Sequence, residues 1–167
     1  NGELDAKVRG MALAFGLDHI VIDPAQLADP AASVFTDQTG LSRGIPAITT
    51  ETGQMGSNDD YWVDLARDGV MNLIRHLKMI DEKEIPNQGV VWLKDYEVIR
   101  AQATGVFQAS VRDGYAVAEG TLLGELLDLF GEPIMDIRAP FAGVVNYVVG
   151  TPPVSEGEPL AMISKIA

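Results

Sequence analysis

The sequence of 167 residues contains no cysteine and two histidines, His19 and His76. The lack of cysteine excludes disulfide bonds and metal sites built from thiolates. No apolar run is long enough to cross a membrane, and no signal peptide is recognisable. We therefore expect a cytoplasmic protein without a membrane partner.

Basic residues are scarce as well. Lys and Arg together number 12 against 24 Asp and Glu, which gives a formal net charge of −12. A nucleic-acid backbone would repel such a chain, so we expect a small-molecule or protein partner, with a homo-oligomer as one possibility. The apolar share of 47% is sufficient for real cores. The first residues carry no initiator Met and lead directly into a helical pattern, so we expect a piece of a longer protein.

The most informative stretch is 44–53, which reads Gly-Ile-Pro-Ala-Ile-Thr-Thr-Glu-Thr-Gly. Its apolar, β-branched residues predict a buried parallel strand over 44–50, with Glu51 at the carboxyl end. Ligands of open α/β sheets bind at that end, and the glycine-containing loop that follows lets a substrate approach the backbone. Glu51 is therefore a candidate catalytic group. The alternative is a carboxylate that only hydrogen-bonds a neighbouring loop or helix terminus.

The flanking patterns predict an α/β segment. Apolar spacing indicates a helix over 4–15, then a strand over 19–23, a loop over 24–30 and a weak helix over 31–41. Together with the strand that ends at Glu51, this order is typical of a parallel α/β layer.

A second, longer helix is predicted from Ser57 to about Ile80. Ser57 and Asp60 form a capping-box-like pair, and Arg75, His76 and Lys78 suit the dipole at the other end. We expect its apolar stripe to lie against the sheet, and that stripe consists of Trp62, Leu65, Ala66, Val70, Leu73, Ile74, Leu77 and Ile80.

Charged and proline-containing residues over 81–89 break the helical pattern and predict a domain boundary, with one domain over 1–86 and the other over 90–167. The second domain contains an internal repeat, because 99–107 matches 137–145 and 117–123 matches 154–160.

The repeat resembles the two halves of a biotinyl/lipoyl-type β-barrel. That resemblance implies a carrier lysine at the tip of the hairpin that joins the halves. Glu132 falls at that position, and no lysine occurs between Lys94 and Lys165. We therefore expect an unmodified all-β barrel rather than a swinging-arm carrier.

The Gly-Ile-Pro-Ala-Ile-Thr-Thr-Glu-x-Gly motif, the long helix and the barrel without its lysine together resemble the C-terminal portion of the succinylglutamate desuccinylase/aspartoacylase family. The resemblance implies the C-terminal part of a zinc-carboxypeptidase-like α/β domain, followed by the β-rich domain. It implies a hydrolase that cleaves an N-acyl amino acid, with Glu51 as general base and Thr52, Gly53 and Gln54 in the substrate-binding wall. The nearest likeness is to deacetylases of acetylated diamino acids, such as acetyl-diaminobutyrate in ectoine breakdown.

The resemblance also implies zinc, held in the family by a His-x-x-Glu pair and a later histidine upstream of the base. Neither histidine here begins that pattern, because Ile22 follows His19 and Met79 follows His76 at the required spacing. A catalytic zinc site needs three protein ligands. We therefore expect the zinc ligands in an upstream segment absent from this chain, no metal ligand within it, and no activity from the chain alone.

A different class of function remains open, namely a non-catalytic binding or assembly module that keeps the scaffold. Arg43, Arg67 and Arg100 do not decide between the two, because isolated surface arginines are usually solvated or structural.

Overall fold

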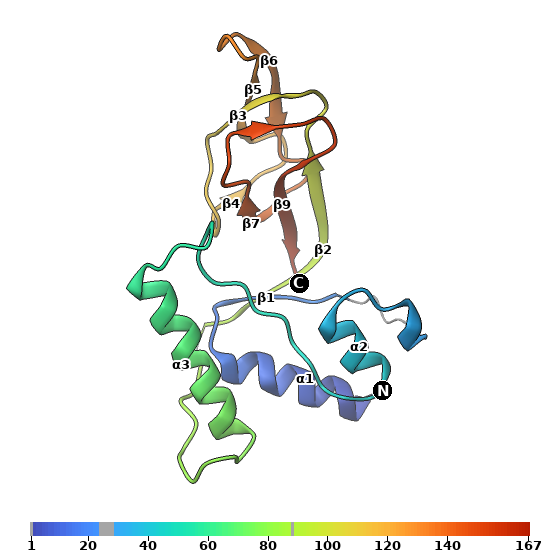
Figure 1. The fold of residues 1–167 in the computed structure, drawn as a ribbon, viewed down its shortest axis with the longest axis vertical. Coiled ribbons are helices and arrows are strands. Elements are labelled where there is room, and N and C mark those ends of the chain that lie inside the picture. Colours follow the sequence, from blue (N-terminus) through green and yellow to red (C-terminus); the bar gives the residue numbers. More distant parts are fainter. Residues whose placement is uncertain (1, 24–28, 88) are drawn as a thin grey trace. The chain divides into compact units, whose positions relative to one another are not determined.

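The computed structural model describes residues 2–23, 29–87 and 89–167. The chain divides into two units (Figure 1). Residues 1–20 and 24–91 form the helical unit, and residues 21–23 and 92–167 form the sheet unit. Most of the predicted loop over 24–30 lies outside the described residues.

The first helix, α1 (Gly2–Phe15), confirms the predicted helix over 4–15. Its buried face consists of Met11, Ala14 and Phe15. Gly16 follows with a φ of 95°, the left-handed conformation that ends many helices and that glycine adopts without strain. None of the helices in the described part of the chain is long and apolar enough to span a bilayer.

The long helix, α3 (Asp60–His76), is shorter than predicted at both ends. Asp59, rather than Ser57, caps it, because the Asp59 carboxylate accepts a hydrogen bond from the Tyr61 N–H at 2.9 Å. The helix ends at His76, and the chain turns at Leu77.

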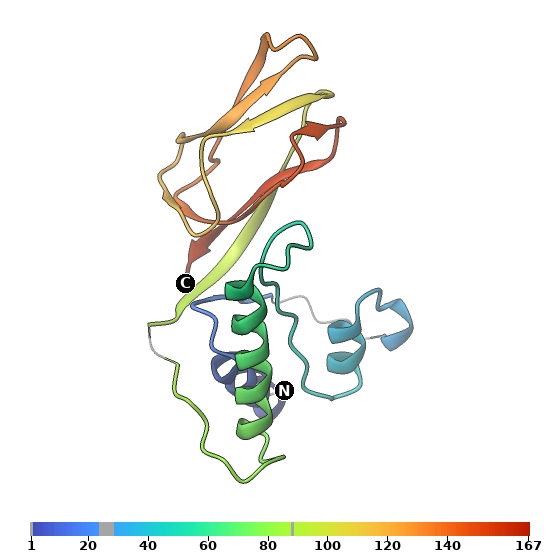
Figure 2. The same cartoon turned by 60° about the vertical axis from the view of Figure 1, so that its left-hand side comes forward.

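The prediction that the apolar stripe of α3 faces a sheet is wrong. The buried residues of α3 are Gly69 and Asn72, whereas Val70 and Leu77 of the stripe are exposed. The face of α3 that carries Gly69 and Asn72 packs against α1, whose C-terminal end lies beside α3 in both ribbon views (Figure 2). Gly69 permits the close approach, since a Cβ there would collide with the ring and the carbonyl oxygen of Phe15.

Asn72 joins three segments of the helical unit. Its Nδ2 donates to the carbonyl oxygens of Ala14 and Ile85, and its Oδ1 accepts from the Ile85 N–H at 2.6 Å. A buried amide with these partners is satisfied, and it fixes the chain after α3 against α1.

The predicted strand over 44–50 is also wrong. The chain passes from the short helices η1 (Pro30–Ala32) and α2 (Thr36–Ser42) into a segment without helix or strand, and Ile45 is 58% exposed. A strand requires a hydrogen-bonded neighbour, and the described residues supply none to this segment. The short strand β1 (His19–Val21) therefore has no parallel partner there, and the expected parallel layer is absent from the described residues.

The sheet unit contains two sheets. One has the order β1-β2-β9-β7-β4 and the other the order β6-β5-β3-β8. The pairings among β2 to β9 are antiparallel. The strand bounds are β2 (Val91–Arg100), β3 (Gly105–Ala109), β4 (Ala116–Val117), β5 (Leu122–Leu127), β6 (Pro133–Arg138), β7 (Gly143–Val148), β8 (Pro153–Val154) and β9 (Pro159–Ile166).

Neither sheet closes on itself, so the structure does not show the expected barrel as a closed one. Instead, two open sheets share one core, to which side chains from β3 to β9 contribute. Among the most deeply buried are Leu123, Leu126, Leu160 and Ile163.

The sequence repeat corresponds to a repeat in the structure. Strands β2 to β5 of the first half correspond in order to β6 to β9 of the second half. If each strand in the order β2-β9-β7-β4 is replaced by its counterpart, the result is β6-β5-β3-β8, which is the strand order of the other sheet. Each half also binds the turn of the other, because Arg100 Nη1 donates to the Gly157 carbonyl at 2.9 Å and Arg138 Nη1 donates to the Gly120 carbonyl at 3.0 Å.

Candidate functional site

The segment 44–59, which joins α2 to α3, contains all four residues predicted for the site (Figure 1). Its first residues fold back on α2, where the Ile45 N–H donates to the Gly40 carbonyl at 2.9 Å. A Cβ at Gly40 would lie 3.2 Å from Ala47 Cβ, so the backbones of α2 and this segment lie close together.

Glu51 lies in the middle of this segment and is exposed to solvent. Within residues 2–23, 29–87 and 89–167, its carboxylate has no hydrogen-bond or ion-pair partner. A carboxylate without a protein partner can accept a proton from a bound molecule.

The residues after Glu51 form a compact loop. Thr52 is half-buried, and Gly53 has a φ of 79°. The Ser57 N–H donates to the Gln54 carbonyl at 3.0 Å, and the two residues between them, Met55 and Gly56, have φ values of 58° and 66°. Positive φ at both central positions is typical of a type I′ turn. The structure thus brings Glu51, Thr52, Gly53 and Gln54 together just before α3.

An aromatic pair at the start of α3 borders this loop, whereas the apolar stripe predicts that Trp62 faces a sheet. The rings of Tyr61 and Trp62 meet edge to face, with centroids 4.8 Å apart and an interplanar angle of 73°. A Cβ at Gly53 would lie 3.3 Å from Trp62 Cβ, so the loop backbone rests against the Trp62 side chain. The available sequence signal for this contact is the spacing of nine residues between Gly53 and Trp62, which lies near the start of the helix.

Each of the two histidines contacts a carboxylate of the helical unit outside the segment 44–59. His19 Nδ1 lies 3.0 Å from Asp18 Oδ1, and His76 Nδ1 lies 2.7 Å from Glu84 Oε2. The described residues contain no group of three His, Asp or Glu side chains that could hold a metal ion. They therefore do not fit a catalytic zinc ion, which requires three protein ligands.

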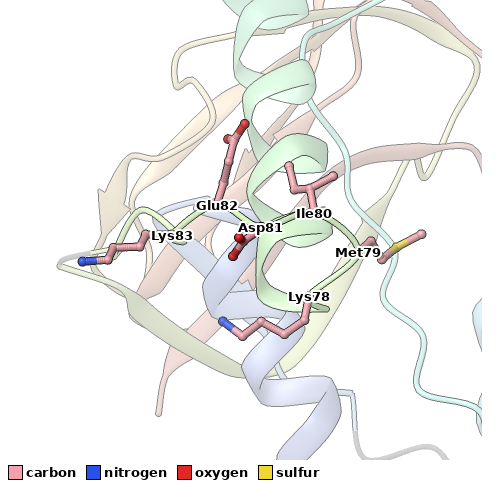
Figure 3. Close-up of a pocket in the computed structure, with 6 residues that line it drawn as sticks. All are labelled: Lys78, Met79, Ile80, Asp81, Glu82 and Lys83. Carbon is pink, nitrogen blue, oxygen red and sulfur yellow. The ribbon is translucent and has the colours of Figure 1, made fainter.

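Two hollows in the helical unit are not lined by Glu51. The larger, of about 530 Å³, is lined by six consecutive residues of the turn after α3, from Lys78 to Lys83 (Figure 3). Their side chains point in different directions rather than toward a common centre. The smaller, of about 160 Å³, is lined by Glu3, Leu4, Lys7 and Gly44. Neither shows the convergent polar groups of a ligand site.

Glu132 lies where the repeat predicted it, in the hairpin between β5 and β6 that joins the two halves. The Asp128 carboxylate shapes this tip by accepting hydrogen bonds from the N–H groups of Phe130 and Glu132 at 2.8 and 2.9 Å. Leu129 and Phe130 at the tip are 80% and 93% exposed. The absence of a carrier modification stays a prediction.

No model of a known protein family and no curated protein matches this sequence. Solved structures do match its fold. A succinylglutamate desuccinylase/aspartoacylase from Rhodobacter sphaeroides is 21% identical, with a TM-score of 0.85, and the match covers 100% of this chain and 51% of that one.

Two further structures agree. The product-bound ectoine utilization protein EutE (DoeB) from Ruegeria pomeroyi is 22% identical, with a TM-score of 0.84, over 99% of this chain and 50% of that one. An aspartoacylase family protein from Mesorhizobium loti is 20% identical, with a TM-score of 0.76, over 100% of this chain and 49% of that one. The chain has the fold of about half of each structure, which confirms at the level of fold the resemblance carried by the motifs.

Proposed function

We propose that this chain is the C-terminal portion of a zinc-dependent deacylase that hydrolyses an N-acyl amino acid, with Glu51 as the general base. The fold supports this proposal, because the whole chain matches about half of three structures named as desuccinylase/aspartoacylase or ectoine utilization proteins. The motif supports the assignment to the C-terminal portion, since Gly-Ile-Pro-Ala-Ile-Thr-Thr-Glu-x-Gly, which carries the base in the proposed family, lies at 44–53.

The single observation that carries the role of Glu51 is its exposed carboxylate, which has no hydrogen-bond or ion-pair partner among the described residues. Such a carboxylate takes a proton from an attacking water and gives it to the departing amine, as amide hydrolysis requires. The compact loop over 52–57 would border the substrate and limit the directions that Glu51 can take.

The described residues do not fit zinc, so we place its ligands in a segment outside this chain and derive no step from the metal. The same division accounts for the segment 44–50. In the complete enzyme, the other half would supply the neighbours that this segment lacks here.

For the substrate, we propose an N-acetylated diamino acid. The support is the product-bound ectoine utilization protein, which matches 99% of this chain. Hydrolysis would be assayed with such a compound alongside N-acetylaspartate, which changes the amino acid alone, and N-succinylglutamate, which changes both the acyl group and the amino acid.

A second candidate function is an assembly module without catalysis. The exposed Leu129 and Phe130 at the β5–β6 tip favour it, because adjacent exposed apolar side chains mark sites of protein–protein contact. The coding sequence upstream of Asn1 discriminates between the two candidates, since an Asp-x-His or His-x-x-Glu segment there supports the enzyme.

The test of the proposed role is Glu51→Gln in the complete protein. We expect turnover to fall about 100-fold or more while fold and zinc content are preserved. Glu119→Gln is the matched control, because Glu119 is also exposed and the substitution removes the same charge. Near-normal turnover of Glu51→Gln would remove Glu51 from the mechanism.

A further inference from the structure

The backbone of the candidate site touches one side chain of the neighbouring helix. A Cβ at Gly53 would lie 3.3 Å from Trp62 Cβ, 3.4 Å from Cγ and 3.6 Å from Cδ1. An added methyl group at Gly53 would require Trp62 to shift by a few tenths of an ångström. The backbone at Gly53 therefore packs against the Cβ of Trp62 and the adjoining edge of its indole ring.

Trp62 is itself held by a fixed helix. It lies in the first turn of α3, whose start is capped by Asp59 and whose middle packs on α1 through Gly69 and Asn72. The Tyr61 ring adds an edge-to-face contact with the indole. The position of the indole is thus fixed by α3, and the loop that contains Gly53 packs against it.

Glu51 lies two residues before this contact. Two extended residues span roughly 7 Å at most, so the position of Gly53 limits where the Glu51 backbone can lie. On the far side of Gly53, the turn over 54–57 closes with the hydrogen bond from Ser57 to Gln54. The contact with Trp62 is the point that ties this loop to α3.

We propose that Trp62 is a positioning residue for Glu51, acting through its contact with Gly53. This inference rests on the proposed function and adds a residue outside the motif. The indole holds the loop so that the Glu51 carboxylate keeps one direction toward the substrate. Loss of that contact misplaces the base and slows proton transfer, while substrate binding changes less.

The contact is tested first in this chain, without any assay of activity. Trp62 and Trp92 are the two tryptophans of the sequence, so Trp92→Phe leaves Trp62 as the sole reporter. In that background we expect Gly53→Ala to shift Trp62 emission to longer wavelength and to increase its quenching by acrylamide.

Gly56→Ala is the matched control for the loop. Gly56 also has a positive φ, 66° against 79° at Gly53, but a Cβ there meets nothing within 4 Å. Both substitutions strain the backbone, and Gly53→Ala alone pushes on the indole. Equal spectra for the two variants would overturn the contact.

The positioning role is tested in the complete deacylase. We expect Trp62→Ala to lower kcat about 10- to 100-fold with a much smaller change in KM, and Trp62→Phe to restore most of kcat because it keeps the aromatic stem. Val63→Ala, on the same helix turn with its side chain 51% exposed, should leave both constants unchanged.

The outcomes separate this inference from the proposed function. If Glu51→Gln abolishes turnover and Trp62→Ala leaves kcat at the level of the parent, Trp62 does not position the base. If Glu51→Gln is active, the proposed role of Glu51 fails, although the fluorescence comparison still reports on the contact. Equal losses in Trp62→Ala and Trp62→Phe, with a lowered melting temperature in both, would indicate a structural role and contradict the proposal.

Discussion

The two units bury their side chains very differently. In the sheet unit, Leu93, Leu123, Leu126, Leu160 and Ile163 are fully buried. Among the described residues of the helical unit, the buried apolar side chains belong to Met11, Ala14 and Phe15. Apolar burial therefore stabilises the sheet unit far more than the helical unit, which relies on the packing of α1 against α3 and on the hydrogen bonds of Asn72.

The helical unit also exposes large apolar side chains before α2 and in the segment that carries the candidate site. Phe35 is 63% exposed, Ile45 58% and Met55 66%. On the proposal above, the half of the enzyme that this chain does not span would cover such residues. The unit that carries the candidate base would then be the unit that depends on the rest of the protein.

The largest effect is expected from a truncation in the sheet core. Leu123→Ala should lower the free energy of unfolding of the sheet unit by about 2–5 kcal/mol, because Leu123 is fully buried and the substitution leaves a cavity. Denaturant unfolding followed by Trp92, in a Trp62→Phe background, measures this change.

Leu129→Ala is the control for that measurement. Leu129 is 80% exposed at the hairpin tip, so its truncation should alter the unfolding free energy by no more than about 0.5 kcal/mol. If the two leucine variants were equally stable, the shared core of the two sheets would be in doubt.

An intermediate effect is expected from the polar contact that holds the helical unit together. Asn72→Ala leaves the N–H and carbonyl of Ile85 and the carbonyl of Ala14 without the side-chain partner they have now. We expect the helical unit to lose about 1–3 kcal/mol, since orphaned polar groups in a partly buried site are costly.

Trp62 emission in a Trp92→Phe background reports this loss. Asn58→Ala, at an exposed position of the same unit, should have no comparable effect. Simultaneous unfolding of both units in the Asn72 variant would contradict the idea that the units differ in what stabilises them.

The same contrast explains which features the sequence could predict. The repeat predicted the correspondence of the two sheets. Gly105 and Gly143 are equivalent positions of the repeat, and each begins a strand where a Cβ would collide with a backbone oxygen of a neighbouring strand, so the same local constraint appears twice in the sequence. The helix over 60–76 was also predictable, since Asp59 and Asp60 at one end and Arg75 and His76 at the other are local signals.

The failures concern features that depend on neighbours. The residues 44–50 have the composition of a strand, but a strand forms only beside another one, and that requirement cannot be read from the segment itself. The buried face of α3 was missed because Gly69 and Asn72 mark it, and neither contributes to an apolar stripe. For the site, sequence placed Glu51 next to a glycine loop, and the contact of Gly53 with Trp62 required the structure.

The smallest effect is expected at the exposed start of α1. The hydrogen bond from Lys7 Nζ, 2.8 Å from Glu3 Oε1, and the attraction of the Lys7 charge hold the pKa of Glu3 below its ordinary value. A lowered pKa in the folded state means that ionised Glu3 favours the helix. This contribution is present above the ordinary pKa of 4.5 and is lost as the pH falls through the lower, folded value.

Lys7→Met should therefore raise the pKa of Glu3 toward its ordinary value and slightly reduce the helicity of α1 above pH 5 or so, with no change below the folded pKa. The pKa is read from an NMR titration of the Glu3 carboxyl carbon in both proteins. High salt should raise the pKa of Glu3 in the parent chain and have little effect in the variant, because the Lys7 charge that salt screens is gone. An unchanged pKa in Lys7→Met would show that the pair at the start of α1 does not persist in solution, and the contrast between a loosely held helical unit and a well-packed sheet unit would then extend to the surface of α1.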